Sequence, residues 1–490
     1  MSRCRAIYFA VVLVGGLAGC SSSPSGPVDG WMVAANRGQP PRVRAAGVER
    51  GWASESDVKV ATAKASELFW TPGMPAEVRI AAVRSMASEP AADAALKRLV
   101  RLSLPHESNH EVMVELCSLT LARRWIEMTP GLVRGLSLSV PDVDDGNRVE
   151  AKTLTQLHPG RSLTEIALGV LTDPGAREPD EPPGLDLRRR ARIDAWNLLA
   201  RTDPGGEARR AWADQEINKE VFGGAVRAFV HDTGVLPRTG EELVWAEGVW
   251  REQAGRAWLG EVREAVALLS PMHRAGLEMR HLEPVRLARG GPWFDAPRSA
   301  LYAEVERRQA GRTIHVRSID QIHRRGPNRE RVRDWVNELG WGDLLSILVV
   351  DDAMRQGAAV REFLKFADLD RRDVSTEYGG ALFADPQGAP TIRLYPPRPG
   401  ERAGDERFIA SREMLDETGT ALAYFHFHVQ PRRFRDVAGP SRGDLLTAAL
   451  LGRTSLVLTM VRPGVLNVDV YFPTGAVIDL GEIGPGEAGS

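Results

Sequence analysis

The sequence lacks the short motifs that assign many enzymes and binding proteins to a class at once. It has no G-x-x-x-x-G-K-[ST] phosphate loop, no G-x-S-x-G nucleophile turn and no C-x-x-C pair. Beyond its N-terminal segment it also has no run of about 20 apolar residues, the length that a membrane-spanning helix requires. These absences argue against a P-loop nucleotide-binding protein, an α/β-hydrolase and a chain held in a bilayer by its own helix.

Neither sign of charge is in excess. The chain has 63 lysines and arginines against 65 aspartates and glutamates, which gives a net charge of −2. A nucleic-acid-binding surface usually shows as a basic excess, so the sequence predicts no nucleic acid among the partners. At 490 residues the chain is longer than one hydrophobic core supports, and two or three domains are expected.

The N-terminus has the layout of a secretory signal. Two arginines precede an apolar run over residues 6–14, which is too short to span a bilayer. Residues 17–20 (LAGC) then resemble the lipobox of bacterial lipoproteins. The resemblance implies a signal peptide over residues 1–19, a lipid on Cys20, and an exported chain anchored to a bacterial membrane on its periplasmic or outer face. The alternative is an ordinary cleaved signal with a cysteine there by chance.

The tether and the state of the cysteines follow from this interpretation. Residues 20–60 begin with a Ser/Pro/Gly-rich stretch and are expected to form a tether or linker. Cys4 would leave with the signal and Cys20 would carry lipid, so no intramolecular disulfide is expected. Cys117 would then be the only free thiol, and its apolar helical surroundings indicate a core residue.

Residues 61–214 have a helical pattern. Amphipathic segments of this kind are residues 76–86, 92–102, 111–125 and 188–200. Short helices that alternate with Pro/Asp turns every twenty residues or so resemble HEAT-type repeats, although the pattern includes no diagnostic motif. The resemblance implies an α-solenoid in which each helix pair buries its apolar face on its neighbours. An irregular helical array is the open alternative.

The region that follows is less regular. Residues 215–340 are mixed, mainly helical and rich in tryptophan, and we assign them no function from the sequence. Residues 333–364 are expected to be helical in two pieces, broken at the Gly-Trp-Gly of residues 340–342.

After Asp368 the hydrophobic period changes from 3.6 to 2. Strands are predicted over residues 381–384, 391–395, 421–429, 455–460, 465–472 and 476–480. A helix is predicted over residues 441–451, with Ser441 at its N-cap position. The fold class is therefore multidomain, an α-helical HEAT-like array followed by an α+β domain over residues 341–490.

Residues with chemical potential occur in this domain in a meaningful order. Glu377 comes first, His426 and His428 follow on a strand, and Ser441 and Asp444 open the next helix. Side chains two apart on a strand project to the same face, so both imidazoles are available to one cation. With an aspartate as the third ligand and an open fourth position, this is how catalytic zinc is arranged. Each feature alone also has a structural explanation as a polar strand face, a helix cap or a turn.

This pattern resembles the JAMM (MPN+) family of metalloproteases, whose motif is a glutamate, then His-x-His, then Ser-x-x-Asp. The resemblance covers roughly the last 150 residues and implies a JAMM-like, cytidine-deaminase-like fold with one Zn²⁺ per chain. It implies that His426, His428 and Asp444 hold the zinc. It also implies that Glu377 acts as general base on zinc-bound water and that Ser441 supports the oxyanion. Zinc lowers the pKa of its water to ~7, and a nearby carboxylate can then take the proton.

One departure from the family concerns spacing. Twelve residues separate His428 from Ser441, more than the family usually has, so residues within 430–439 are expected to form an enlarged loop. Longer surface loops cost little free energy, and the site is not excluded. Asp436, which lies in this loop, is an alternative to Asp444 as the third ligand.

A second histidine motif lies in the helical region. Residues 106–110 (HESNH) match the H-E-x-x-H of zincin metalloproteases, in which both histidines lie one turn apart within a helix. Pro105 stands directly before the motif, and Ser108 and Asn109 favour a helix cap over a helix interior. The motif is therefore predicted to be a loop that joins two helices.

These features together predict a membrane-tethered zinc metallohydrolase that cleaves a peptide or isopeptide bond in a peptide or protein substrate. The competing interpretation is non-enzymatic. In it, a lipid-anchored HEAT-like scaffold binds protein and carries a degenerate C-terminal domain.

Overall fold

The structure is a computed structural model of the chain. It describes residues 29–138, 143–176, 186–215, 222–315, 329–385, 387–402, 404, 408–417, 419–430 and 438–485. Cys20, with the predicted signal peptide, and Asp436 lie outside these residues. The chain divides into two compact units, one made of Met1–Ser103 and Glu107–Leu116 and the other of Leu104–His106 and Cys117–Ser490.

The first unit is helical. Its helices are α1 (Gly30–Ala35), α2 (Pro41–Ser54), α3 (Val58–Trp70), α4 (Ala76–Ala87), α5 (Asp93–Ser103) and the first part of α6 (His110–Ala122). Helices α4 and α5 confirm the segments predicted over residues 76–86 and 92–102. A helical N-terminal array is thus present, while its assignment to HEAT repeats stays a prediction.

Helices α1 and α2 occupy much of the segment that was expected to be a linker. The Asp29 side chain caps α1 by accepting a hydrogen bond from Trp31 N at 2.9 Å. Gly30 and Gly51 allow the two helices to approach closely, because a Cβ on Gly30 would collide with Gly51 N. Within this segment, Gly30 and Gly51 therefore serve helix packing.

The second unit begins with further helices. They are α7 (Thr129–Ser137), α8 (Val149–Leu157), α9 (Leu163–Thr172), α10 (Leu187–Thr202), α11 (Glu207–Ala213), α12 (Gly224–Thr233), α13 (Gly240–Arg251), α14 (Gln253–Ala267), α15 (Pro271–Ala275), α16 (Leu282–Ala288), α17 (Arg298–Ala310), α18 (Trp341–Met354), α19 (Gly357–Arg372), α20 (Arg412–Glu417) and α21 (Arg442–Leu451). Short 3₁₀ helices across the two units are η1 (Pro90–Ala92), η2 (Ile126–Met128), η3 (Asp145–Asn147), η6 (Met279–His281), η8 (Val332–Trp335) and η9 (Pro399–Glu401). Helix α10 confirms the segment predicted over residues 188–200.

One predicted helix break lies elsewhere. The Gly-Trp-Gly sequence starts α18 rather than interrupting a helix, because the Asp343 side chain accepts a hydrogen bond from Gly340 N at 2.9 Å and caps it. The interruption falls instead at residues 355–356, between α18 and α19.

The strands form one mixed six-stranded sheet. They are β1 (Gly379–Ala384), β2 (Pro390–Leu394), β3 (Ala423–His428), β4 (Ser455–Arg462), β5 (Val465–Tyr471) and β6 (Val477–Ile483). The order is β2-β1-β3-β4-β5-β6, and every neighbouring pair is antiparallel except β3 and β4, which α21 connects. All six predicted strands are present, and the C-terminal region is α+β.

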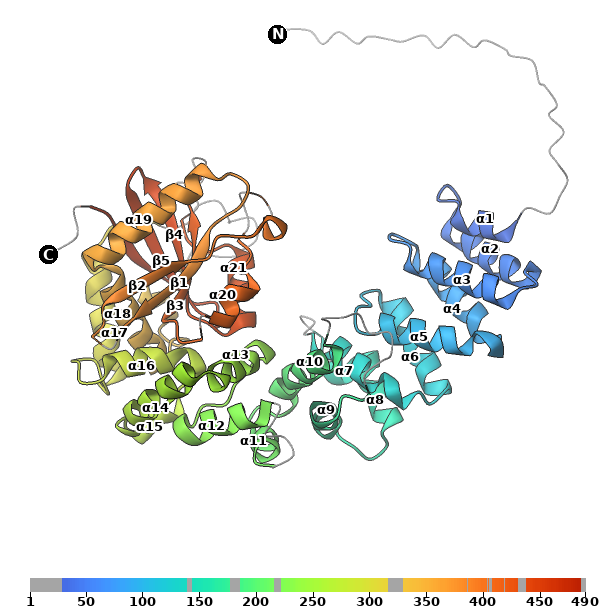
Figure 1. Cartoon of the computed structure of the whole chain (residues 1–490), viewed down its shortest axis with the longest axis horizontal. Helices are drawn as coiled ribbons and strands as arrows, with labels where there is room; N and C mark the ends of the chain where they lie inside the picture. Colours follow the sequence, from blue (N-terminus) through green and yellow to red (C-terminus); the bar gives the residue numbers. More distant parts are fainter. Residues whose placement is uncertain are drawn as a thin grey trace, which may run out of the picture. The chain divides into compact units, whose positions relative to one another are not determined.

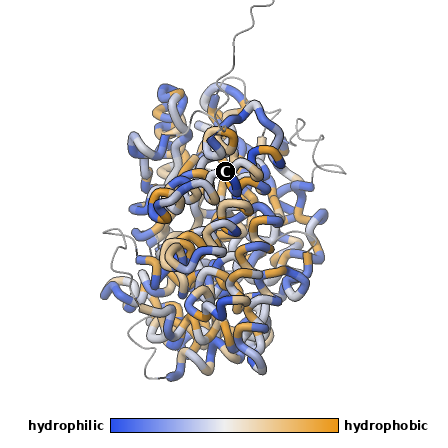
Figure 2. Tube along the Cα trace, turned by 90° about the vertical axis from the view of Figure 1, so that its right-hand side faces the viewer, coloured by the Kyte–Doolittle hydropathy of each residue, from blue (hydrophilic) through white to orange (hydrophobic). Residues whose placement is uncertain are grey.

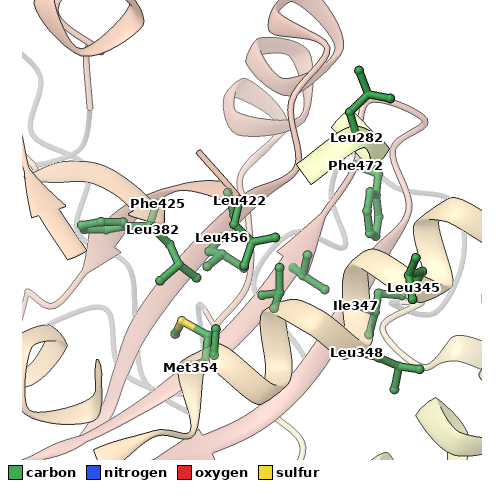
Figure 3. Packing of buried hydrophobic residues seen from close by; sticks show 14 of the residues in the cluster. Leu282, Leu345, Ile347, Leu348, Met354, Leu382, Leu422, Phe425, Leu456 and Phe472 are labelled. Carbon is green, nitrogen blue, oxygen red and sulfur yellow. The ribbon is translucent and has the colours of Figure 1, made fainter. Parts of the chain in front are cut away.

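Helices cover both faces of this sheet. Figure 1 shows α17, α18 and α19 on one side and α20 and α21 on the other. The first side holds the main hydrophobic cluster, and Figure 3 labels side chains that α16, α18 and strands β1, β3 and β4, among other segments, contribute to it. The cluster extends from Ala225 in α12 to Ile483 in β6, so helices before residue 341 pack in the same core as the sheet. The domain limit at residue 341 stays a prediction.

Hydrophobic and hydrophilic residues alternate along the elements of both units, as Figure 2 shows by colour. Among the described residues, no helix combines the length and the apolar character needed to cross a membrane.

Candidate metal centre

Strand β3 sorts its side chains onto the two faces of the sheet. Phe425 and Phe427 enter the hydrophobic cluster, where the Phe363 ring meets them at centroid distances of 5.1 and 6.5 Å. His426 and His428 lie on the opposite face, with their Nε2 atoms 3.3 Å apart. The period of two in this strand therefore brings both imidazoles to one place.

Strand β1 brings Glu377 to the histidines. Gly379, two residues after Glu377, pairs with His426 across the ladder. Neither Gly379 nor Gly380 has room for a side chain, because a Cβ on Gly380 would collide with a carbonyl oxygen of β2. Glu377 is only 3% exposed, and its Oε1 lies 4.0 Å from His428 Nε2. The two glycines thus allow close strand pairing that places the glutamate beside the imidazoles.

Helix α21 presents Asp444 to the same imidazoles. Ser441 is the N-cap, and its Oγ accepts a hydrogen bond from Asp444 N at 3.2 Å. In return Asp444 Oδ2 accepts from Ser441 N at 2.6 Å. From this position Asp444 Oδ1 lies 3.4 Å from His426 Nε2, and Oδ2 lies 3.9 Å from His428 Nε2. The aspartate therefore caps the helix and faces both histidines.

The charge of Asp444 is set by these neighbours. Burial raises the pKa of its carboxyl, but the adjacent imidazoles of His426 and His428 and the hydrogen bond from Ser441 N outweigh burial. They hold the pKa of Asp444 below its usual value. Asp444 is consequently ionised at neutral pH and offers a negatively charged oxygen to the site.

The donor set fits a metal ion in kind and in spacing. Ligand atoms of Glu377, His426 and His428 all lie within 4.8 Å of one another, and the three residues are buried. In a tetrahedral zinc site with bonds of about 2.0–2.1 Å, neighbouring ligand atoms stand roughly 3.3 Å apart. The 3.3 Å between the imidazole nitrogens and the 3.4 Å from His426 to Asp444 match that separation. A hydrogen bond between the imidazoles would explain the first distance alone, whereas a cation explains why two carboxylates also gather there.

Two aromatic residues pack against His426. The Phe408 ring stacks parallel to His426 at a centroid distance of 5.9 Å, and Tyr471 meets the same imidazole edge-on at 6.4 Å. Burial, together with the charge of Asp444, raises the pKa of Tyr471, which keeps it a neutral phenol. No local motif indicates Phe408 or Tyr471, because their proximity to His426 depends on contacts between segments that are distant in the sequence.

The second histidine motif does not form a metal site of the zincin kind. Helix α6 begins at His110, and the Asn109 side chain caps it by accepting from Val112 N at 3.1 Å. His106 precedes that helix, so the two histidines do not lie one turn apart within it. Glu107 forms an ion pair with Arg79. The predicted loop is confirmed.

The one thiol among the described residues is also structural in character. Cys117 is 1% exposed, and burial raises the pKa of its thiol to about 12. A thiol that stays protonated is a weak nucleophile, which agrees with the predicted core position.

A second buried group was not expected from the sequence. Glu330, Asp469 and Asp479 are buried and place carboxylate oxygens within 4.8 Å of one another. The sequence shows Asp469 and Asp479 each as a single acid in a mainly apolar strand, and Glu330 between two arginines. Only the register of β5 with β6 brings the two aspartates side by side.

No protein-family model, curated protein or solved structure matches this chain.

Proposed function

We propose that the C-terminal region is a zinc-dependent hydrolase that cleaves a peptide or isopeptide bond, as the resemblance to the JAMM family implies. The observation that carries the proposal is the convergence of His426, His428, Asp444 and Glu377 on one buried point. These residues come from strand β3, from the segment just before β1 and from helix α21, and the separations between their polar atoms run from 3.3 to 4.0 Å.

The residues would divide the chemistry among them. His426 and His428 would offer Nε2 and Asp444 a carboxylate oxygen to a zinc ion, which when bound supplies a Lewis acid and lowers the pKa of water to ~7. Glu377, with its Oε1 4.0 Å from His428 Nε2, would be the general base that accepts a proton from water and the acid that returns it to the departing amine.

Ser441 would act on the substrate carbonyl. Its Oγ accepts from Asp444 N, and a hydroxyl that accepts one hydrogen bond still has its own hydrogen to donate. A donor at the helix N-terminus is suited to a developing oxyanion, since the backbone dipoles of α21 favour negative charge there.

Metal content of the purified full-length protein tests the site. We expect close to one zinc per chain in the wild type and a loss of it in His426→Ala and in His428→Ala. His110→Ala, a histidine of the second motif, is the matched control and should keep the metal. Asp444→Asn and Asp436→Asn compare the two candidate third ligands, and the first should lose more zinc. A wild type without bound metal would contradict the proposal and favour the non-enzymatic scaffold.

Glu377 separates catalysis from metal binding. Glu377→Gln keeps the shape of the side chain but cannot accept a proton, so hydrolysis should fall by roughly 10²- to 10⁴-fold. Its zinc content should stay at the wild-type level, as measured on the same sample by mass spectrometry of the metal. If Glu377→Gln hydrolysed substrate at the wild-type rate, Glu377 would not be the general base.

We also propose, from the lipobox resemblance alone, that Cys20 carries the lipid that anchors an exported chain to a bacterial membrane. Cys20→Ser should move the protein from the detergent phase to the aqueous phase in a partition experiment. Partition that the substitution leaves unchanged would contradict lipid anchoring at Cys20.

A further inference from the structure

A pocket lies on the histidine face of the sheet, beside the first residues of β3. Helix α13 lies next to α20 and α21 there, as Figure 1 shows, and residues of these helices form its walls. The apolar lining includes Trp245, Val249, Leu415, Leu451 and, on β3, Tyr424. The cavity has a volume of about 40 Å³, while one water needs roughly 10–15 Å³. A group as small as a carboxylate therefore fits, whereas an aromatic ring is too large.

The charged side chains that line this pocket differ in depth. Arg453 is only 6% exposed, and its guanidinium lies over the Trp245 ring at 3.3 Å from the centroid. Arg412 and Asp416 are exposed and pair with each other at 2.9 Å, and Glu241 is half-buried. The deep part of the pocket therefore carries positive charge, while its acids lie nearer the surface.

The stacked guanidinium of Arg453 is suited to a carboxylate. Its flat face lies against Trp245, so its N–H donors, which lie in the guanidinium plane, are directed past the ring. Glu242 is a neighbouring acid, but a guanidinium has five donors and can serve partners within the fold and a ligand at the same time. Two parallel N–H groups of an arginine match the two oxygens of a carboxylate.

Contacts within the fold hold the walls of the pocket in place. The indole Nε1 of Trp245 donates to Gly419 O at 2.5 Å. A Cβ on Gly419 would lie 2.7 Å from Val249 Cγ2, so glycine allows the segment after α20 to approach α13 closely. A pocket whose walls are already fixed loses less entropy when a ligand binds.

Two elements lead from the pocket to the candidate metal centre. On β3, Tyr424 and His426 are two residues apart on one face, about 6.6–6.8 Å at 3.3–3.4 Å per residue. On α21, Leu451 follows Asp444 by seven residues, about 10.5 Å at 1.5 Å per residue. An extended peptide advances about 3.3 Å per residue. A substrate with its scissile bond at the metal centre would thus reach the pocket with a side chain two or three residues away.

The flank of α21 between the two sites is exposed. Leu445 packs on the other flank, in the small cluster over β4, β5 and β6. At 3.6 residues per turn, Gly443, Thr447 and Leu450 lie on the flank opposite Leu445, and all three are exposed. This flank offers a substrate chain a path from the metal centre to the pocket.

We propose that the pocket binds the carboxylate of an acidic substrate side chain, Glu or Asp, two or three residues from the scissile bond. The link to cleavage rests on the proposed hydrolase function. Arg453 would bind the carboxylate, and the apolar walls would pack on the methylene groups of the side chain, which favours Glu over the shorter Asp. The substrates of the metal centre would then be acidic peptides or proteins.

Peptide binding tests the pocket without reference to catalysis. The probes are two Ala/Ser/Gly heptapeptides with a central Glu or Gln, acetylated and amidated so that only the side chain supplies a carboxylate. In calorimetric titration of the metal-depleted full-length protein, the Glu peptide should bind roughly tenfold or more tightly than the Gln peptide, as expected for hydrogen bonds between charged groups. A Gln peptide with a free C-terminal carboxylate should bind no better than its amidated form.

Substitutions of arginine locate the binding group. Arg453→Gln should reduce the affinity for the Glu peptide to that for the Gln peptide, and Arg453→Lys, which keeps the charge but loses the planar fork, should restore it in part. Arg412→Gln is the matched control, because it makes the same change at an exposed arginine of the same pocket. It should alter the affinity less than about twofold, as is usual for an exposed pair.

A second variant blocks the pocket without removing a buried charge. Gly248 lines the pocket, and a Cβ there would meet no atom within 4 Å. Gly248→Phe should therefore fold as the wild type does and weaken binding of the Glu peptide by roughly tenfold, the whole preference for Glu. Gly260→Phe is the matched control, since Gly260 in α14 has equal space and does not line the pocket. This pair decides the question even if Arg453→Gln fails to fold.

Hydrolysis then tests the link to the metal centre. With zinc-loaded protein and internally quenched peptides that carry Glu or Gln at each position in turn, kcat/KM should be highest with Glu two or three residues from the cleaved bond. Arg453→Gln should remove that preference. Cleavage without any preference for Glu would overturn the inference and leave the hydrolase proposal standing. Binding that depends on Arg453, without cleavage of any peptide, would do the reverse.

The binding experiment can also overturn the pocket directly. A wild type that binds the Glu and Gln peptides equally, or binds neither, would do so. Tighter binding of the peptide with a free C-terminus would assign the pocket to a terminal carboxylate and overturn the side-chain assignment.

Discussion

The two faces of the six-stranded sheet are both covered, yet two neighbouring rows of side chains, one on each face, differ in chemistry. One row across the strands consists of Phe425, Leu456, Val470 and Ile478, and the next row consists of His426, Val457, Asp469 and Asp479. The first row lies in the main hydrophobic cluster, and the second includes His426 of the candidate metal centre and the buried acids Asp469 and Asp479. Apolar burial explains why the sheet is stable, whereas buried polar groups lower stability unless they are matched by partners or ions. The polar face is therefore where function is to be sought.

The largest difference in stability is expected between substitutions of two neighbouring residues of β3 whose side chains lie on opposite faces of the sheet. Phe427→Ala leaves a cavity at a 0% exposed position, and the free energy of unfolding should fall by about 3–5 kcal/mol. His428→Leu, one residue further, replaces a buried polar ring with an apolar side chain. In metal-depleted protein it should change stability by no more than about 1 kcal/mol, while abolishing zinc binding.

Chemical denaturation of both variants without metal, followed by zinc titration, measures this difference. An equal loss of stability at the two positions would show that the histidine face contributes to the core as the phenylalanine face does.

Glu242 on α13 sharpens the comparison, because its pKa moves in the direction opposite to that of Asp444. Burial, opposed by a backbone hydrogen bond from Arg238, raises the pKa of Glu242 to about 7 from 4.5. The folded state therefore holds this proton more tightly than the unfolded state does. Its contribution to stability is complete below pH 4.5 and is lost as pH rises through 7.

The loss amounts to about 3 kcal/mol, since each pKa unit corresponds to 1.36 kcal/mol. Glu242→Gln cannot ionise, so stability measured by urea unfolding at pH 5 and at pH 8 should differ less in this variant than in the wild type. If both proteins showed the same pH dependence of stability, the pKa of Glu242 would not be raised in the folded state.

Features that depend on local sequence were predictable. The six strands follow from alternation between turn residues, and the Ser441 cap follows from its position before an apolar helix. Placing His426 and His428 on one face needed only the period of a strand. These properties are determined by a few neighbouring residues, so they do not depend on the rest of the fold.

Features that depend on strand register or close packing were not predictable. Asp469 and Asp479 meet because β5 pairs with β6, and Glu330 reaches them from a distant segment. Gly30 and Gly51 lie in the range that was expected to be a tether or linker, and they allow two helices to approach closely. In each case the deciding contact joins residues whose own neighbours in the chain carry no sign of it.

The smallest effect concerns Ser441, which belongs both to the fold and to the proposed site. Ser441→Ala removes the Oγ that accepts from Asp444 N and should lower stability by about 1 kcal/mol, as loss of an N-cap usually does. Because Asp444 keeps its hydrogen bond from the Ser441 backbone, zinc content should remain near the wild-type level. Ser441→Thr, which retains a hydroxyl cap, is the matched control and should restore both stability and hydrolysis. If Ser441→Ala lost stability but kept full hydrolysis, the serine would serve the helix alone, and the oxyanion role would have to pass to another donor.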